Sequence, residues 1–93
     1  MSSFDSDKVK EALLFALERD YKLYGKKGAQ GLLQLSKVIG TAQWKMMNDG
    51  VRPLPKESTF KRCFTQLVRE GKAEEKVVKV RRVHTVHLVK PTG

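Results

Sequence analysis

The chain is poor in cysteine and in long apolar runs, and each shortage excludes a class of protein. Cys63 is the only cysteine among the 93 residues, so an intrachain disulfide is excluded and a reducing, intracellular setting fits best. The longest apolar run, Ala12–Leu17, is far too short to span a bilayer. The first residues also lack the basic lead and apolar stretch of a secretion signal. We therefore expect an intracellular protein of the cytoplasm, the nucleoid or the nucleus, without a membrane partner.

The residues that enzymes and metal centres use are also scarce. His84 and His87 are the only histidines, and on an expected strand their side chains point to opposite faces, so they cannot share a metal ion. Cys63 lies in an expected core stripe, which makes it a poor nucleophile. Glu74 and Glu75 are neighbours on a strand and face apart, so they cannot act as an acid/base pair. We expect no metal, no cofactor and no enzyme activity.

Acidic residues are few after residue 20, whereas basic residues are many. The whole chain has a formal net charge of +9 at pH 7. Residues 1–20 hold three bases against five acids, a net of −2, whereas residues 21–93 hold sixteen bases against five acids, a net of +11. This asymmetry predicts a surface for nucleic acid or another polyanion, away from the N-terminal segment.

Hydrophobic spacing predicts one domain over residues 1–93, with an ordered core from about residue 6 to residue 89. A first helix should run from about Ser6 to Tyr24 and stop at the glycine that follows. Three glycines in residues 25–31 predict a flexible basic connector, whose Lys26 and Lys27 can touch phosphate. A Walker-type phosphate cradle is not expected, because two leucines follow the last glycine.

The middle of the chain predicts two short helices. The first, over 32–40, carries Lys37 on its polar side and ends at its own glycine. The second, over 42–48, is expected to turn Trp44 and Met47 inward. A turn signal and two prolines then predict an irregular connection to the next helix.

A basic amphipathic helix is predicted over 57–70, with Ser58 as its N-cap. Its core stripe follows helical spacing and consists of Phe60, Cys63, Phe64 and Leu67. Its opposite face is polar and basic, without an acid, and consists of Ser58, Lys61, Arg62, Thr65, Gln66 and Arg69.

Alternating valines over 73–89 predict a β-hairpin directly after this helix. The turn should lie near 79–82, where the basic residues Lys79, Arg81 and Arg82 gather.

Three helices followed by a basic hairpin make the order of a winged helix-turn-helix domain. The second helix of that superfamily resembles LLQLSKVIG in this chain, and its third helix and first wing strand resemble STFKRCFTQLVREGKAEEKVV. With the first helix included, the resemblance covers most of residues 6–89. It implies an α+β fold, a three-helix winged helix-turn-helix with a C-terminal two-stranded β-hairpin wing.

The resemblance also implies that helix 57–70 enters the major groove of double-stranded DNA and that the 79–82 tip contacts backbone or minor groove. Arg62 and Lys61 suit guanine edges and Gln66 suits adenine, while hydroxyls and lysines at a helix N-terminus suit phosphates. The chain would be a small DNA-binding regulator of transcription. The predicted contacts are Lys26, Lys27, Lys37, Lys56, Ser58, Thr59, Lys61, Arg62, Thr65, Gln66, Arg69, Lys79, Arg81 and Arg82.

Three alternatives stay open at this point. The chain could be an RNA-binding winged helix of a ribonucleoprotein, because basicity alone does not separate RNA from DNA. It could be an interaction module for an acidic protein, with an exposed Trp44 as the hot spot. The stretch LSKVIGTAQWKMMNDG also resembles phage-repressor helix-turn-helix domains, in which 41–48 would read bases through Gln43 and Lys45.

A homodimer is a further expectation, because winged-helix modules often pair on two half-sites. The first helix region supplies spare apolar residues for pairing: Phe4, Phe15, Tyr21 and Tyr24.

Overall fold

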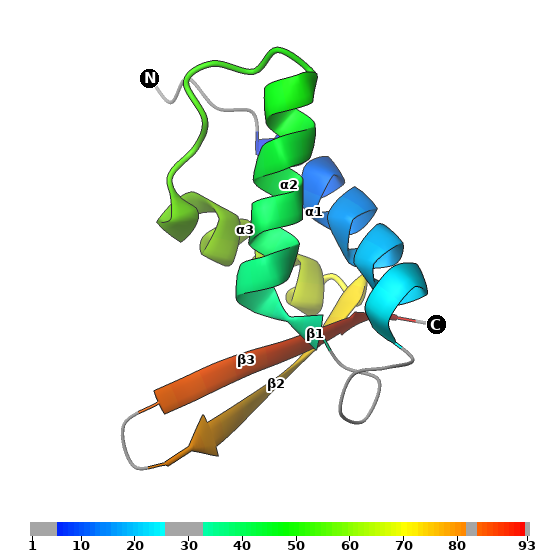
Figure 1. Cartoon of the computed structure of the whole chain (residues 1–93), viewed down its shortest axis with the longest axis vertical. Helices are drawn as coiled ribbons and strands as arrows, with labels where there is room; N and C mark the ends of the chain where they lie inside the picture. The colour runs from blue at the N-terminus through cyan, green and yellow to red at the C-terminus, as the bar shows by residue number, and fades with distance from the viewer. Residues whose placement is uncertain (1–5, 26–32, 82–83, 93) are drawn as a thin grey trace.

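Three helices and a three-stranded antiparallel sheet make up residues 6–25, 33–81 and 84–92, the part of the chain that the computed structural model describes (Figure 1). The elements follow the order α1 (Ser6–Asp20), a π-helical turn (Tyr21–Gly25), β1 (Leu33–Gln34), α2 (Leu35–Asn48), α3 (Glu57–Arg69), β2 (Ala73–Val80) and β3 (His84–Pro91). The predicted α+β class is confirmed.

The helix α2 corrects the predicted pair of short helices. Gly40 lies inside a single helix, and the buried residues Ala42 and Met46 continue its core stripe one and two turns further on. An interior glycine costs about 1 kcal/mol relative to alanine, less than the burial of such side chains contributes. Met46 is therefore the core residue, 4% exposed, whereas Trp44 and Met47, both predicted to face inward, are 53% and 51% exposed.

The helix α3 matches its predicted core stripe. Its four apolar positions, Phe60, Cys63, Phe64 and Leu67, are all buried, as predicted. Burial raises the pKa of the Cys63 thiol, which keeps it in the unreactive neutral form. The predicted N-cap is wrong, because the capping position is Lys56 and no side chain caps the helix.

The sheet has the strand order β1–β3–β2, so the hairpin is extended by a short strand that the sequence analysis missed. The hairpin register runs from Ala73 opposite Pro91 to Val80 opposite His84, which places the connection at residues 81–83. On the other side of β3, Leu33 lies opposite Val89, and both side chains are buried.

The core lies between the three helices and one face of the sheet, and it draws residues from α1, α2, α3 and all three described strands. A single polar side chain, Asp20, is buried within the described residues. Its carboxylate accepts a 2.8 Å hydrogen bond from the Thr41 hydroxyl, so the end of α1 is tied to the middle of α2. In the same ranges, no helix has the length and apolar character to cross a membrane.

An ion pair ties α1 to the end of α3 and predicts a pH dependence of stability. Lys10 Nζ lies 2.8 Å from Glu70 Oε2, and this hydrogen bond lowers the pKa of Glu70 and raises that of Lys10. Because the Glu70 pKa is lowered in the fold, its stabilisation is present above the unfolded value of about 4.3 and is lost as the pH falls through the folded value. The Lys10 contribution is lost only as the pH rises above 10.5.

We expect Glu70→Gln to melt at a lower temperature than the wild type at pH 7 and to approach the wild-type melting temperature near pH 3. A melting difference that persists undiminished in acid would contradict the ion pair.

Candidate nucleic-acid interface

The exposed side of α3 carries a polar stripe opposite its core stripe. Ser58, Arg62, Thr65 and Arg69 recur at i, i+4, i+7 and i+11 and are all exposed. Because the apolar stripe packs inward, this row points away from the rest of the domain. At 1.5 Å per residue α3 is about 20 Å long, long enough to follow a DNA groove.

Several predicted contact residues of α3 have internal partners or are partly buried. Lys61 Nζ lies 4.0 Å from Glu57 Oε1, so the face does contain an acid, and the Lys61 charge is partly offset. The Thr65 hydroxyl donates to the Lys61 carbonyl at 3.1 Å, which leaves only its acceptor lone pairs for a ligand. Thr59 and Gln66 are half-buried, at the edge of the stripe.

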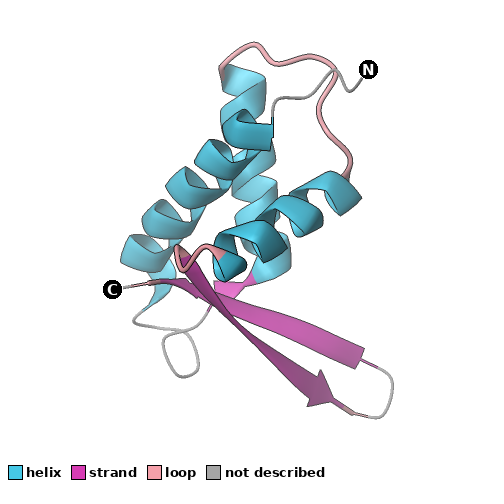
Figure 2. Cartoon of the chain, turned by 180° about the vertical axis from the view of Figure 1, so that it is seen from behind, coloured by secondary structure: helices cyan, strands magenta, loops and turns pink. Residues whose placement is uncertain are grey.

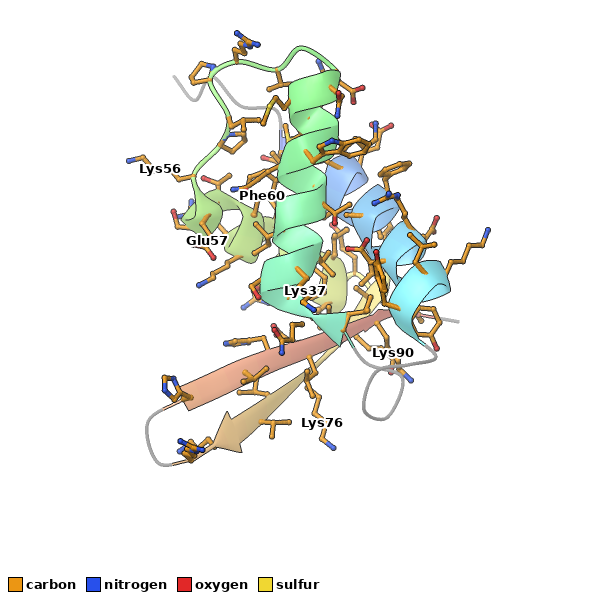
Figure 3. All side chains as sticks on the ribbon, viewed as in Figure 1. Lys37, Lys56, Glu57, Phe60, Lys76 and Lys90 are labelled. Atoms are coloured by element: carbon orange, nitrogen blue, oxygen red, sulfur yellow. The ribbon has the colours of Figure 1, made fainter. Side chains whose placement is uncertain are left out.

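The hairpin has two faces, which the register defines. The face toward the helices holds Ala73, Glu75, Val77 and Lys79 of β2 and Thr85, His87, Val89 and Pro91 of β3. The outer face holds Lys76 and Lys90, and Figure 3 shows Lys76 pointing away from the helices. Lys79 is therefore the described strand cation on the hairpin face that is directed toward the helices.

Arg81 forms the start of the hairpin connection. Its side chain is exposed and its φ is 59°, in the left-handed region that an arginine rarely adopts. The strain of this conformation is tolerated at a position that projects a cation from the tip of the wing.

The arrangement brings α3 and the hairpin tip to one side of the molecule. In both Figure 1 and Figure 2, the N-terminal end of α3 and the hairpin tip project in the same direction, away from the C-terminal end of α1. Figure 3 places Lys56 at the outer end of α3 and Lys37 at the end of α2 near the sheet. The N-terminal end of α3 with Lys56 and the hairpin tip thus lie on one side of the molecule, and Lys37 lies near the sheet.

All of the described cations among the predicted contacts, except Lys61, lack an acidic partner. Within the described ranges, six exposed predicted cations form no ion pair: Lys37, Lys56, Arg62, Arg69, Lys79 and Arg81. In contrast, Lys10, Arg19, Lys45, Lys72 and Lys90 are each within 4.0 Å of a carboxylate. Other exposed cations without an ion pair, among them Lys22, lie on other elements. The predicted contacts Lys26, Lys27 and Arg82 lie outside the described residues.

The alternative recognition element over 41–48 is not a separate helix but the second half of α2. Its two candidate base-contacting residues also either form an ion pair or are half-buried. Lys45 pairs with Asp49 at 2.8 Å and lies 4.9 Å from the centre of the Phe15 ring, and Gln43 is half-buried. These contacts argue against base reading through this segment.

The hairpin also holds a pair that the sequence analysis did not predict. His87 Nδ1 lies 3.0 Å from Glu75 Oε2, across the two strands and on the face toward the helices. Only the register brings these residues together. No cluster of three metal-binding side chains occurs in the ranges that the structure covers.

Comparisons with known proteins leave the geometry as the sole guide. Neither the protein-family models, nor the curated proteins, nor the solved structures give a match to this chain. The chemistry of the exposed side of α3 and of the wing is therefore the basis for assigning a function.

Proposed function

We propose that this chain binds double-stranded DNA as a winged-helix domain, with α3 in the major groove and the β2–β3 hairpin on the backbone or in the minor groove. The observation that carries the proposal is the set of six unpaired cations on α3, the wing and the adjoining end of α2. Cations without internal partners release counterions when they meet phosphates, which drives binding to DNA.

The residues of α3 divide into readers and anchors. Arg62 lies in the middle of the exposed row, where a guanidinium can meet guanine O6 and N7 with two hydrogen bonds. Lys56 and Ser58 lie at the N-terminus of α3, where unsatisfied backbone N–H groups favour a phosphate. Arg69 extends the row to the last turn of the helix and suits the opposite edge of the groove.

The wing adds contacts that do not depend on sequence. Lys79 and Arg81 suit phosphates or a narrow minor groove, where positive charge is attracted without a hydrogen bond to a particular base edge. A protein of this design would act as a small regulator of transcription. The neutral α1 side would face away from the DNA.

Arg81→Gly tests the wing without damaging the fold. Glycine adopts a φ of 59° freely, so the variant should be at least as stable as the wild type. Binding to labelled duplexes of several sequences should weaken several-fold for all of them, and the log–log salt slope should fall by about 1. Fluorescence anisotropy measures both quantities.

The matched control is Lys22→Ala, which removes an exposed cation with no ion pair from the π-helical turn that follows α1. It should bind as the wild type does. Equal losses in the two variants would mean that only net charge matters, and the wing would have no role. Structured RNA that outcompetes the duplex at equal length would move the proposal from DNA to RNA.

A further inference from the structure

Exposed apolar side chains gather on the side of the molecule that lacks unpaired interface cations. Among the described residues, the large exposed hydrophobic side chains belong to α1, the π-helical turn and α2, with one exception on the wing, Val77. They are Phe15, Tyr21, Leu23, Tyr24, Trp44 and Met47. None belongs to α3. An exposed apolar cluster of this kind marks an interaction surface.

Phe15 and Trp44 belong to this surface, and each ring is contacted by a cation of the other helix. Arg19 of α1 lies 5.4 Å from the centre of the Trp44 ring, and Lys45 of α2 lies 4.9 Å from that of Phe15. Each cation reaches across to the aromatic ring of the other helix, which fixes the rings in place. We call Phe15, Arg19, Trp44 and Lys45 the seam surface.

The charges around the seam surface suit a second copy of the same chain. Glu11 and Glu18 flank Phe15 on the exposed side of α1, at i−4 and i+3, while Arg19 lies toward α2. An acidic rim beside a cationic seam is complementary to itself under a two-fold rotation, because Glu18 of one copy can meet Arg19 of the other. A purely acidic partner would be repelled by the glutamates, and a purely basic one by the cations.

The distribution of charge over the whole chain supports the same occupant. Residues 6–25 hold four acids and four bases, a net of zero, whereas the chain as a whole carries +9. Two such chains repel each other over most of their surface, and repulsion is low along this neutral segment.

We infer that a second copy of this chain covers the seam surface and that the protein is a two-fold dimer through α1 and α2. The pairing needs no nucleic acid. Dimerisation can therefore fail while the proposed DNA binding holds, and DNA binding can fail while dimerisation holds. In the dimer both α3 helices stay exposed, because they lie away from the seam.

Light scattering coupled to size-exclusion chromatography tests this on the full chain without nucleic acid. The wild type should show twice the 10.6 kDa of the monomer. Trp44→Ser should shift it to the monomer mass, whereas Val77→Ser, which removes an equally exposed apolar side chain (54% against 53%), should leave the dimer intact. A wild type that stays monomeric at every concentration overturns the inference and leaves the surface to a different protein. A Trp44→Ser variant that still dimerises overturns it as well.

A charge exchange keeps the test valid if Trp44→Ser fails to fold. Glu18→Arg should split the dimer, because it places cations opposite Arg19 of the other copy, and the double variant Glu18→Arg, Arg19→Glu should restore it. Restoration distinguishes a contact between copies from a loss of fold. The emission of Trp44, the sole tryptophan, should shift to the red as the wild type is diluted. An unchanged dimer in Glu18→Arg would contradict the pairing.

Discussion

Replacing Phe60 by alanine is expected to lower the free energy of unfolding by about 3–5 kcal/mol, the largest effect of any single substitution proposed for this chain. Phe60 is 0% exposed and is the first apolar anchor of α3. The loss combines the burial of a large ring with the cavity left behind. A chain of this length is stable by about 5–14 kcal/mol, so the variant loses a large fraction of its stability and should unfold at a much lower urea concentration.

Urea denaturation followed by circular dichroism measures this loss. Val77→Ala is the matched control, because it truncates an apolar side chain that is 54% exposed, and it should stay within about 0.5 kcal/mol of the wild type. A loss below about 1 kcal/mol for Phe60→Ala would show that α3 does not pack on α1 and α2 as described.

Replacing Arg62 by alanine is expected to weaken binding to a preferred duplex by about 1–3 kcal/mol and to flatten the preference among sequences. Arg62 is exposed in the centre of the α3 row and has no acidic partner among the described residues, so its guanidinium is available for a base edge. Arg62→Lys keeps the charge but lacks the two-pronged donor geometry. It should retain much of the affinity for unrelated sequences and lose the preference.

The matched control for Arg62→Ala is Lys61→Ala, which removes the adjacent cation. Because Lys61 is already near Glu57, its loss should cost less and leave the order of preferred sequences unchanged. The comparison uses anisotropy titrations against a panel of duplexes at one salt concentration. An unchanged preference in Arg62→Ala would show that α3 is not the reading helix.

Local patterns in the sequence were enough to predict the buried side of α3 and the β2–β3 hairpin. The i, i+3, i+4, i+7 spacing around Phe60 predicts the buried side of α3, and alternating valines predict the hairpin. The continuity of α2 was missed because Gly40 was treated as a stop signal. Its place inside the helix follows from the burial of Met46 against the rest of the core, which is a tertiary effect. The strand β1 is too short, at two residues, to carry a pattern of its own.

Some features of the candidate site could likewise be predicted from the sequence, and others could not. The exposed row on α3 follows from helical spacing alone, and the Glu57–Lys61 contact could have been found from its i, i+4 spacing. Which wing cation faces the helices could not be predicted, because shifting the register by one residue exchanges Lys76 and Lys79 between faces. The exposure of Trp44 could not be predicted from the sequence either, because it depends on the rotation of α2 against α1.

The most direct test of the proposed function is the salt dependence of duplex binding by the wild type. If the five unpaired cations other than the base-reading Arg62 contact phosphates, the log–log slope should approach about −4.5, and affinity should fall by about 500-fold between 50 and 200 mM salt. Anisotropy of a labelled duplex across that range measures the slope. A steep slope near this value supports a double-stranded DNA surface built from α3 and the wing, and a flat response would contradict it.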